Sequence, residues 1–394
     1  MLQEIHIENY KSIQKLKLGL GRVTVLIGEN GSGKSNILEA IALASAAAND
    51  KLDNEFLFSR GIRVTEPEYM RSAFDKEQIT QGIKINFYGK HSDFKFGYVL
   101  QNNNKPYSSW LIEENKIDKR KEQEIDNDIR EKYNPIIPVN VRNLKIEFDN
   151  NDNDFILETI ERKKKQFIKK EFHQNCLDNF LIYSPEIFAL RQFEKEGQIQ
   201  PLGINGEGLF KLLKVLSLDP SKITELKEKL KLLFWFEDFT IQADFLDSEK
   251  SLKTKDRYLA PDLSAFDQKS ANEGFLFLLF YFALFISDDT PRFFAIDNID
   301  ASLNPKLCSQ LMRELIQLAK KYDKQVIVTT HNPAILDGLD LDDPEQQLWV
   351  IYRNKFGHTK ARPVEKPAPL EGQDPVKLSE AFMRGYIGGL PKNF

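Results

Sequence analysis

One eight-residue segment, Gly28 to Ser35, constrains this chain more than any other. Its sequence, GENGSGKS, fits the pattern G-x-x-x-x-G-K-[ST] of a phosphate-binding loop. Its glycines let the backbone turn tightly enough for successive N–H groups to point inward and hold a polyphosphate. Lys34 would bring positive charge to the β- and γ-phosphates, and the Ser35 hydroxyl is a hard oxygen ligand for Mg²⁺. The predicted nucleotide-binding residues are Asn30, Gly31, Ser32, Gly33, Lys34 and Ser35.

The residues on either side of this loop have the pattern that such a loop requires. Residues 23–27 are apolar and mostly β-branched, which predicts a strand. Residues 36–48 are rich in Ala, Leu and Ile, which predicts a helix. Strand, loop and helix in this order place bound phosphates at the N-terminus of the helix. A glycine-rich turn without a ligand is the alternative, and it leaves the flanking strand and helix unexplained.

Two further apolar runs end in residues suited to the same chemistry. Residues 293–296 are followed by Asp297, and residues 326–330 are followed by His331. Buried parallel strands present their carboxyl ends at the edge of the sheet where α/β proteins bind ligands. We expect Asp297 to hold Mg²⁺ together with Ser35, and His331 to donate a hydrogen bond to a γ-phosphate.

The composition limits the class of protein. A chain of 394 residues predicts one large domain with an insertion, or two domains. The formal net charge of −4 provides no overall basic field for nucleic acid, and two cysteines predict a reduced, cytoplasmic protein without disulfides. The most apolar run, residues 275–286, is too short to span a bilayer, so we expect a buried helix there and no membrane partner.

The rest of the chain mixes alternating and helical patterns. Alternation predicts a hairpin in the first twenty residues and antiparallel strands at 83–88 and 94–100. Helical spacing predicts two helices between residues 209 and 233, followed by a strand at 239–243.

The hydrophilic stretch from 111 to 180 contains two features that suggest ligands. The acidic run 149–154 lacks the glycine and the glutamate of a calcium loop, so we interpret it as a solvated turn. A basic stripe from Arg162 to Lys170 could contact nucleic-acid phosphates, but a solvated helix face is the commoner explanation of such a stripe. The stripe consists of Arg162, Lys163, Lys164, Lys165, Lys169 and Lys170.

Four segments together resemble the ABC-type ATPases, and within them the branch that contains RecF, SMC and OLD proteins. They are the phosphate loop, the helix predicted from residue 270, the acid-ended strand followed by residues 300–305 (DASLNP), and residues 330–333 (THNP). The opening residues 7–13 (IENYKSI) are similar to the start of that branch as well. The chain also resembles stand-alone ATPase subunits of bacterial antiphage systems.

This resemblance implies a head that forms a homodimer or higher homo-oligomer around ATP and Mg²⁺. Each ATP would lie between the phosphate loop of one protomer and the signature helix of the other. In this sequence Gly274 matches the signature glycine, and Asn272 stands where the family usually has serine. Both are therefore candidate nucleotide-binding residues.

Asn298 is the most informative departure from the family pattern. The family has glutamate directly after the magnesium-binding aspartate, where it orients or deprotonates the attacking water. Asparagine cannot accept that proton, and general-base assistance is worth about a hundredfold to ten-thousandfold in rate. We therefore expect slow ATP hydrolysis, with Asp297, Asn298 and His331 as the catalytic candidates.

These observations predict an α/β fold: a P-loop ABC-type head with a mixed sheet, helices on both faces and an antiparallel β subdomain. Residues 1–100 and 256–394 would form the head, and residues 101–255 a charged, mostly helical insertion that projects as a lid or arm.

Three functions fit this architecture to different degrees. The first is an ATP-gated subunit that controls a separate effector, such as a nuclease, in antiphage defence. A RecF-like, DNA-binding ATPase in genome maintenance is the alternative, with DNA contacted through the basic stripe. A transporter motor is a weaker option, because of the long insertion and the lack of a membrane segment.

Overall fold

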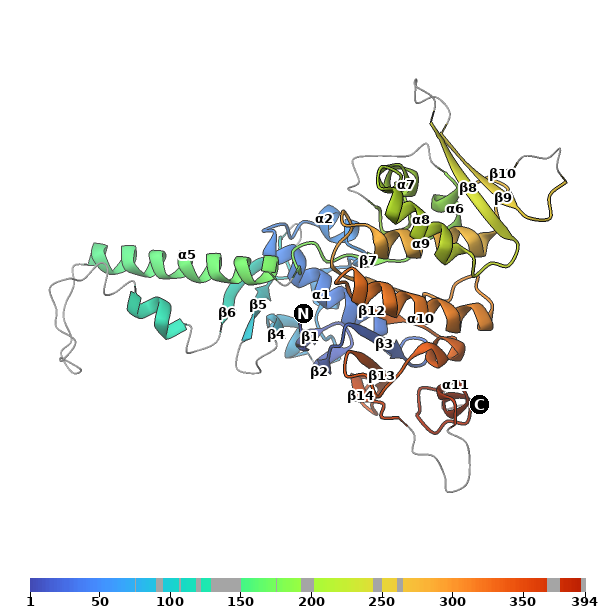
Figure 1. Cartoon of the computed structure of the whole chain (residues 1–394). Helices are drawn as coiled ribbons and strands as arrows, with labels where there is room; N and C mark the ends of the chain where they lie inside the picture. The colour runs from blue at the N-terminus through green and yellow to red at the C-terminus, as the bar shows by residue number, and fades with distance from the viewer. Residues whose placement is uncertain are drawn as a thin grey trace.

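The computed structural model describes residues 1–74, 76–89, 95–105, 108–117, 122–128, 150–174, 176–192, 202–243, 250–260, 265–366 and 376–390. Within these ranges the strands form one sheet of six, one of five and one of three (Figure 1). None of the described helices combines the length and apolar character needed to cross a bilayer.

Six strands form the central sheet, namely β3 (Val23–Ile27), β7 (Ile182–Tyr183), β11 (Phe293–Ile296), β12 (Gln325–Thr329), β13 (Gln346–Arg353) and β14 (Thr359–Pro363). Their order is β14-β13-β3-β12-β11-β7, and all neighbours are parallel except β13 and β14. Every residue of β3, β11 and β12 is buried, as expected for parallel strands that are covered on both faces. The carboxyl ends of these three strands therefore meet at one edge of the sheet, as predicted.

Five strands form the second, wholly antiparallel sheet, namely β1 (Glu4–Tyr10), β2 (Ile13–Gly19), β4 (Ile83–Tyr88), β5 (Lys95–Gln101) and β6 (Leu111–Ile117). Their order is β2-β1-β4-β5-β6. In β1 and β2 buried and less buried residues alternate, because one face of this sheet packs on the core. The hairpin and the strands predicted at 83–88 and 94–100 are confirmed.

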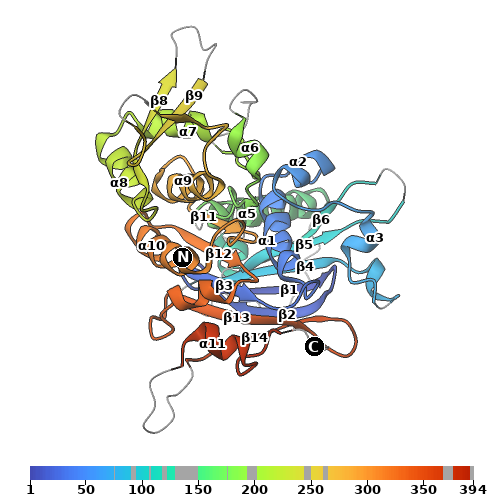
Figure 2. The same ribbon diagram turned by 90° about the vertical axis from the view of Figure 1, so that its right-hand side faces the viewer.

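Two almost fully buried helices determine how the layers pack. Helix α1 (Lys34–Ala48) lies between the six-stranded and five-stranded sheets (Figure 2). Helix α9 (Glu273–Ile286) packs in the core on the other face of the six-stranded sheet. Alternate residues of β3 join the two cores, because Val25 packs in the core around α9 and Leu26 in the core around α1. The predicted helices on both faces are therefore present.

Among the described residues the remaining helices are a helix at 122–128, α2 (Asn54–Ser59), α3 (Pro67–Met70), α5 (Asn150–Gln174), α6 (Ile187–Arg191), α7 (Leu209–Leu216), α8 (Pro220–Leu230), α10 (Pro305–Lys321) and α11 (Leu378–Met383), with the 3₁₀ helices η1 (Gln78–Thr80) and η2 (Pro333–Gly338). Helices α6, α7, α8 and α10 surround α9, which explains why α9 is apolar on all sides. The two helices predicted between residues 209 and 233 are present as α7 and α8, and Asp219 caps α8 ahead of Pro220.

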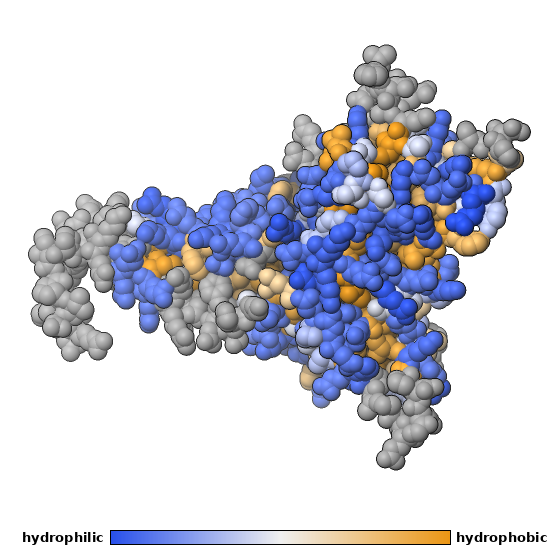
Figure 3. Space-filling model, viewed as in Figure 1, coloured by the Kyte–Doolittle hydropathy of each residue, from blue (hydrophilic) through white to orange (hydrophobic). Residues whose placement is uncertain are grey.

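The stretch from 101 to 255 is more divided than the expected helical insertion. Its strand β6 belongs to the five-stranded sheet, and its strand β7 is an edge of the six-stranded sheet. Strands β8 (Phe236–Ala243) and β9 (Lys250–Asp256) form the third sheet with β10 (Phe266–Asp267). Helix α5 does project from the body as an arm (Figure 1), and its visible face is mostly hydrophilic (Figure 3). A segment in the middle of the sequence thus completes the head as well as extending from it.

Candidate functional site

The loop from Gly28 to Ser35 connects β3 directly to α1, and its glycines are required by backbone shape and by close neighbours. Gly28, Gly31 and Gly33 have φ values of +150°, +76° and +104°, which side-chain-bearing residues rarely adopt. A Cβ at Gly28 would lie 2.1 Å from the carbonyl oxygen of Ile351, and one at Gly33 would lie 2.1 Å from Oγ1 of Thr359. Strands β13 and β14 therefore pack against the loop so tightly that they fix its conformation.

Hydrogen bonds from distant parts of the chain hold the loop in place. The Thr359 hydroxyl donates to the carbonyl of Ser32 at 2.8 Å and lies 2.6 Å from the Ser12 hydroxyl. The Arg353 guanidinium donates from Nε to the carbonyl of Gly31 at 2.7 Å. Because these contacts are already made within the protein, the loop needs little rearrangement to present its N–H groups to a ligand.

Lys34 is a buried cation with properties that favour binding of an anion. Its ammonium donates to the carbonyls of Gly28 and Glu29, at 2.8 and 3.1 Å, and the residue is buried. Burial lowers the pKa of Lys34 to about 8, although the negative charges of Asp297, Glu29 and Asp300 oppose this shift. A buried ammonium bonded only to neutral carbonyls gains from a nearby phosphate, which would supply the missing countercharge.

Asp297 and Ser35, predicted to share a metal, are brought together although 262 positions separate them. The Ser35 hydroxyl donates to Oδ2 of Asp297 at 2.9 Å. Oδ1 of the same carboxylate accepts a hydrogen bond from the Thr329 hydroxyl, at the end of β12. Both donor groups are hard oxygens. Mg²⁺ commonly binds through one or two carboxylates together with substrate phosphates and water.

Such a site fits the described residues better than an all-protein metal cage does. The described part of the chain contains no group of three or more His, Cys, Asp or Glu that could hold a metal. Ser35 and Asp297 would hold Mg²⁺ with the help of nucleotide oxygens. The ion, when bound, would neutralise charge on the phosphates.

Asn298 follows Asp297 in a left-handed backbone conformation, with φ of +56°. Its N–H donates to the Thr329 hydroxyl at 2.9 Å, and its side chain is exposed. Asparagine tolerates this conformation better than most residues with a Cβ, which gives a physical reason for asparagine at this position. Asparagine here accommodates the turn but offers no base.

His331 lies beyond the end of β12, on the same edge of the sheet. Burial and then the positive charge of Lys34 lower the pKa of the His331 imidazole, while Asp300 and Asp297 oppose the shift. The adjacent Thr330 hydroxyl donates to Oδ1 of Asp300 at 2.6 Å. The imidazole is therefore neutral at pH 7 and retains one N–H with which it can donate.

Asn272 and Gly274 lie at the N-terminus of α9, as predicted, but their neighbours are not the phosphate loop. Asn272 is the N-cap residue, and Gly274 is buried. Between them Glu273 accepts a hydrogen bond from the Ser302 hydroxyl at 3.2 Å and lies 3.9 Å from Arg191. The role expected for Asn272 and Gly274 toward the ATP of a second protomer stays a prediction.

The sequence did not identify a group of charged residues beside the loop. The Glu39 carboxylate in α1 is almost fully buried and bonds to the Lys11 ammonium and, at 2.6 Å, to Nε of Arg63. Arg63 also donates to Oδ1 of Asn36, one residue after Ser35, at 3.0 Å. Its side chain remains 66% exposed, so it is available to a ligand at the start of α1. The only sequence signal was the family-like opening at residues 7–13, which contains Lys11.

Strand β7 was missed because it has only two residues. It pairs with β11 so that the Asp297 N–H donates to the carbonyl of Tyr183 at 2.8 Å. Ser184 and Glu186 follow that strand end and are exposed. Two more polar residues therefore lie on the strand end that borders Asp297.

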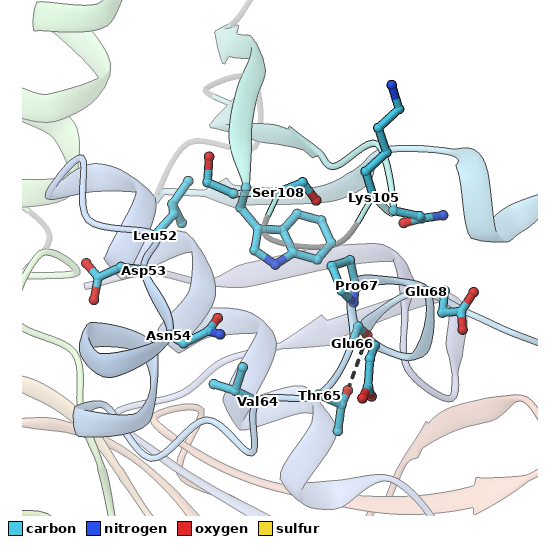
Figure 4. Close-up of a pocket in the computed structure, with 13 residues that line it drawn as sticks. Leu52, Asp53, Asn54, Val64, Thr65, Glu66, Pro67, Glu68, Lys105 and Ser108 are labelled. Atoms are coloured by element: carbon cyan, nitrogen blue, oxygen red, sulfur yellow. Dashed lines mark hydrogen bonds between the residues drawn. The ribbon is translucent and has the colours of Figure 1, made fainter.

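A separate cavity of about 890 Å³ is lined by residues from both sides of Arg63 in sequence, in the ranges 52–54, 64–68, 104–105 and 108–110. Figure 4 shows Asn54 and Val64 on one side of it, and Lys105 and Ser108 on the other. Three acidic residues but only one basic residue line it, which is the opposite of what a polyphosphate needs. Its lining consists of Leu52, Asp53, Asn54, Val64, Thr65, Glu66, Pro67, Glu68, Asn104, Lys105, Ser108, Ser109 and Trp110. This lining therefore favours the loop over the cavity as the candidate phosphate site.

Comparison with known protein families decides the identity of this arrangement. Residues 23–337 match the family described as "AAA domain, putative AbiEii toxin, Type IV TA system". The chain belongs to this family. The phosphate loop, Asp297, Asn298 and His331 all lie inside the matched range. The predicted membership among P-loop ATPases of the RecF and SMC type is confirmed, and proteins of this kind use nucleotide and Mg²⁺.

Two curated relatives match short segments of the chain. The chain is 40% identical over 67 residues to an uncharacterized protein (MJECL10) of Methanocaldococcus jannaschii, and 38% identical over 55 residues to the DNA replication and repair protein RecF of Bacillus thuringiensis. These matches cover 16% and 14% of this chain, and 31% and 15% of those proteins.

The fold is that of an SMC head. An SMC head bound to the C-winged helix domain of ScpA aligns with a TM-score of 0.55 at 14% identity, over 92% of this chain and 98% of the other. An SMC head with an extended coiled coil, bound to the C-terminal domain of ScpA derived from Pyrococcus furiosus, gives 0.50 at 12% identity, over 92% and 96%. The predicted ABC-type head is therefore confirmed as the fold class.

Proposed function

We propose that this AAA-family ATPase binds MgATP at the loop from Gly28 to Ser35, hydrolyses it slowly, and uses it to hold two copies of the head together. The main support is the 2.9 Å hydrogen bond between Ser35 and Asp297, because it joins the phosphate loop to the acid at the end of β11. In the absence of that contact the two predicted halves of the site would be unrelated sequence motifs.

Each residue has a specific task in this proposal. The N–H groups of the loop and of the first turn of α1 bind the phosphates, and the Lys34 ammonium neutralises them. Ser35 and Asp297 hold Mg²⁺, and His331 donates a hydrogen bond to the terminal phosphate. Arg63, anchored by Glu39, adds a second cation on the α1 side of the site.

Slow turnover follows from Asn298. Its amide can orient a water molecule but cannot remove a proton from it, so the general-base contribution of about a hundredfold or more is missing. A slow ATPase remains in its ATP-bound state for a long time. ATP would therefore act chiefly as a clamp in this protein.

The proposed dimer places the N-terminus of α9, with Asn272 and Gly274, against the ATP of the partner subunit. The experiment is a measurement of mass in solution with ATP, ADP and no nucleotide, all with Mg²⁺. We expect the mass to double with ATP for the wild-type protein but not for Lys34→Ala. An unchanged mass in every condition would contradict the clamp.

The clamp would control a separate effector, such as a nuclease. Antiphage defence is the proposed setting because the chain resembles stand-alone ATPase subunits of antiphage systems, and the family description itself names only a putative toxin of a type IV TA system. Residues 1–100 and 256–394 would provide the ATPase head, and part of the 101–255 stretch would provide the arm. Co-purification of the chain with the products of neighbouring genes, in the presence of ATP, tests for such an effector.

A RecF-like role on DNA is the second candidate, supported by the 38% identity to RecF over 55 residues. The basic stripe on α5 supports it less than the sequence suggested. Lys163, Lys164 and Lys165 pair with acids of helix 122–128 and with Asp50. Among the described residues, no acid pairs with the exposed Arg162, Lys169 or Lys170. Gel-shift assays with and without ATP separate this role from the first.

A further inference from the structure

Thr329, the last residue of β12, contacts each of the three residues that follow β11. Its hydroxyl donates to Oδ1 of Asp297 and accepts the N–H of Asn298 at 2.9 Å. Its carbonyl accepts the N–H of Ile299 at 3.2 Å. The side chain is completely buried between its neighbours in the sheet. No other described residue has hydrogen bonds to both Asp297 and Asn298.

We infer that Thr329 is a positioning residue for the magnesium site, an inference that rests on the proposed MgATP binding. A carboxylate held at one oxygen cannot rotate freely about its terminal bond. With Oδ1 held by Thr329, Oδ2 is directed toward Ser35, which is the direction of the proposed metal. Partners behind a metal-binding carboxylate commonly change metal affinity by about 10- to 100-fold when they are removed.

The hydroxyl also anchors the backbone of Asn298. It accepts the Asn298 N–H within the turn whose φ is +56°, so the strained residue and the metal-binding residue share one anchor. Valine has nearly the same shape as threonine but has no hydroxyl, so it would leave Oδ1 of Asp297 and the N–H of Asn298 without this partner. Serine would keep both hydrogen bonds.

The test is a calorimetric titration of ATP into the full-length protein at a series of Mg²⁺ concentrations. We expect Thr329→Val to raise the half-saturating Mg²⁺ concentration by about 10- to 100-fold while ATP binding without Mg²⁺ stays the same. Thr329→Ser should remain within about threefold of wild type because it retains the hydroxyl. Thr24→Val is the matched control, since Thr24 is a buried threonine of β3 whose hydroxyl accepts the N–H of Gly21 at 3.0 Å.

The outcomes separate this inference from the proposed function. A Thr329→Val protein that needs no more Mg²⁺ than wild type would overturn the positioning role. A wild-type protein whose ATP binding ignores Mg²⁺ would instead overturn the proposed magnesium site. If Thr329→Val does not fold, Thr329→Cys replaces it, because its thiol is a weaker donor of similar size and must shift the Mg²⁺ requirement in the same direction.

Discussion

Two buried lysines at opposite ends of the central sheet show how a cation that serves the fold differs from one that serves a ligand. Lys34 follows β3 at the carboxyl edge of the sheet, and Lys324 precedes β12 at the other edge. Burial lowers the pKa of each ammonium to about 8. By burial and pKa alone the two residues would be judged equivalent.

Their hydrogen bonds are different. The Lys324 ammonium donates to the carbonyls of Ser287 and Thr290 and to the Thr290 hydroxyl, at 2.7, 3.0 and 2.9 Å, which satisfies its three N–H groups. The Lys34 ammonium has two carbonyl partners and lies near the acids that would hold a metal. A saturated buried cation closes a loop, whereas an unsaturated one beside acidic groups is available to a ligand.

The largest expected effects come from replacing each of these two lysines in turn. Lys34→Ala should weaken ATP binding by about a hundredfold or more, because it removes a charge-assisted contact to phosphate, and should hardly change the free energy of unfolding. Lys324→Met should do the reverse, lowering the free energy of unfolding by about 3 kcal/mol because buried carbonyls lose their donor. Calorimetric titration and urea unfolding measure the two quantities, and a loss of ATP affinity in Lys324→Met would break the comparison.

Asn298 offers the next largest effect. Asn298→Glu should raise the rate of ATP hydrolysis by about a hundredfold, because a carboxylate can accept a proton from water. The same change should lower the free energy of unfolding by about 1 kcal/mol, since glutamate adopts a left-handed backbone less readily than asparagine. Asn298→Ala is the control and should keep the slow rate. Ordinary turnover by the wild-type protein, unchanged in Asn298→Ala, would contradict the clamp.

A smaller effect is expected from pH. Above about pH 8, free Lys34 loses its proton, so the dissociation constant of ATP should rise by about tenfold per pH unit until the lysine in the complex deprotonates too. While ATP affinity falls in this pH range, the free energy of unfolding rises. The folded-state pKa of Lys324 is lower than its unfolded value, so the unfolded chain binds more protons than the folded chain between about pH 8 and 10.5. The folded protein therefore becomes more stable as the pH rises through that range. Titrations of wild type and Lys324→Met from pH 7 to 9.5 should show the same loss of ATP affinity.

The smallest expected effect concerns DNA binding by α5, where exposed and ion-paired basic residues can be compared in the same way. Replacing the exposed Arg162, Lys169 and Lys170 by alanine should weaken any DNA binding and reduce its salt dependence by up to about 3 in the slope of log affinity against log salt concentration. Replacing the ion-paired Lys163, Lys164 and Lys165 should change that slope less, because their charges are already neutralised. Equal slopes for the two triple variants would show that the observed ion pairs do not matter to DNA binding.

The sequence predicted the parts of this site that are local in the chain. Strand, loop and helix around Lys34 follow from adjacent residues, and Asp297 and His331 were found because each ends an apolar run. The residues that were missed act through contacts between distant parts of the chain. Thr329 contacts Asp297 across a strand pairing, and Arg63 reaches Glu39 over 24 positions. No periodicity in the sequence reports such contacts.

The dependence on distant contacts also explains why residues 101–255 were expected to form an insertion separate from the head. Residues 111–180 are charged, and the pattern correctly favours a solvated helix for α5. The two-residue strand β7 is too short to produce a recognisable pattern, and it becomes a strand only because β11 is there to pair with it. The stretch was therefore expected to be separate from the head that it helps to complete.

The most direct test is a calorimetric titration of ATP into the wild-type protein and into Lys34→Ala, with and without Mg²⁺. We predict one ATP bound per chain, binding about tenfold or more tighter with Mg²⁺, and binding by Lys34→Ala that is weaker by about a hundredfold or more. Binding that is equal in the two proteins, or absent from both, would contradict the assignment of the loop and Asp297 as one MgATP site.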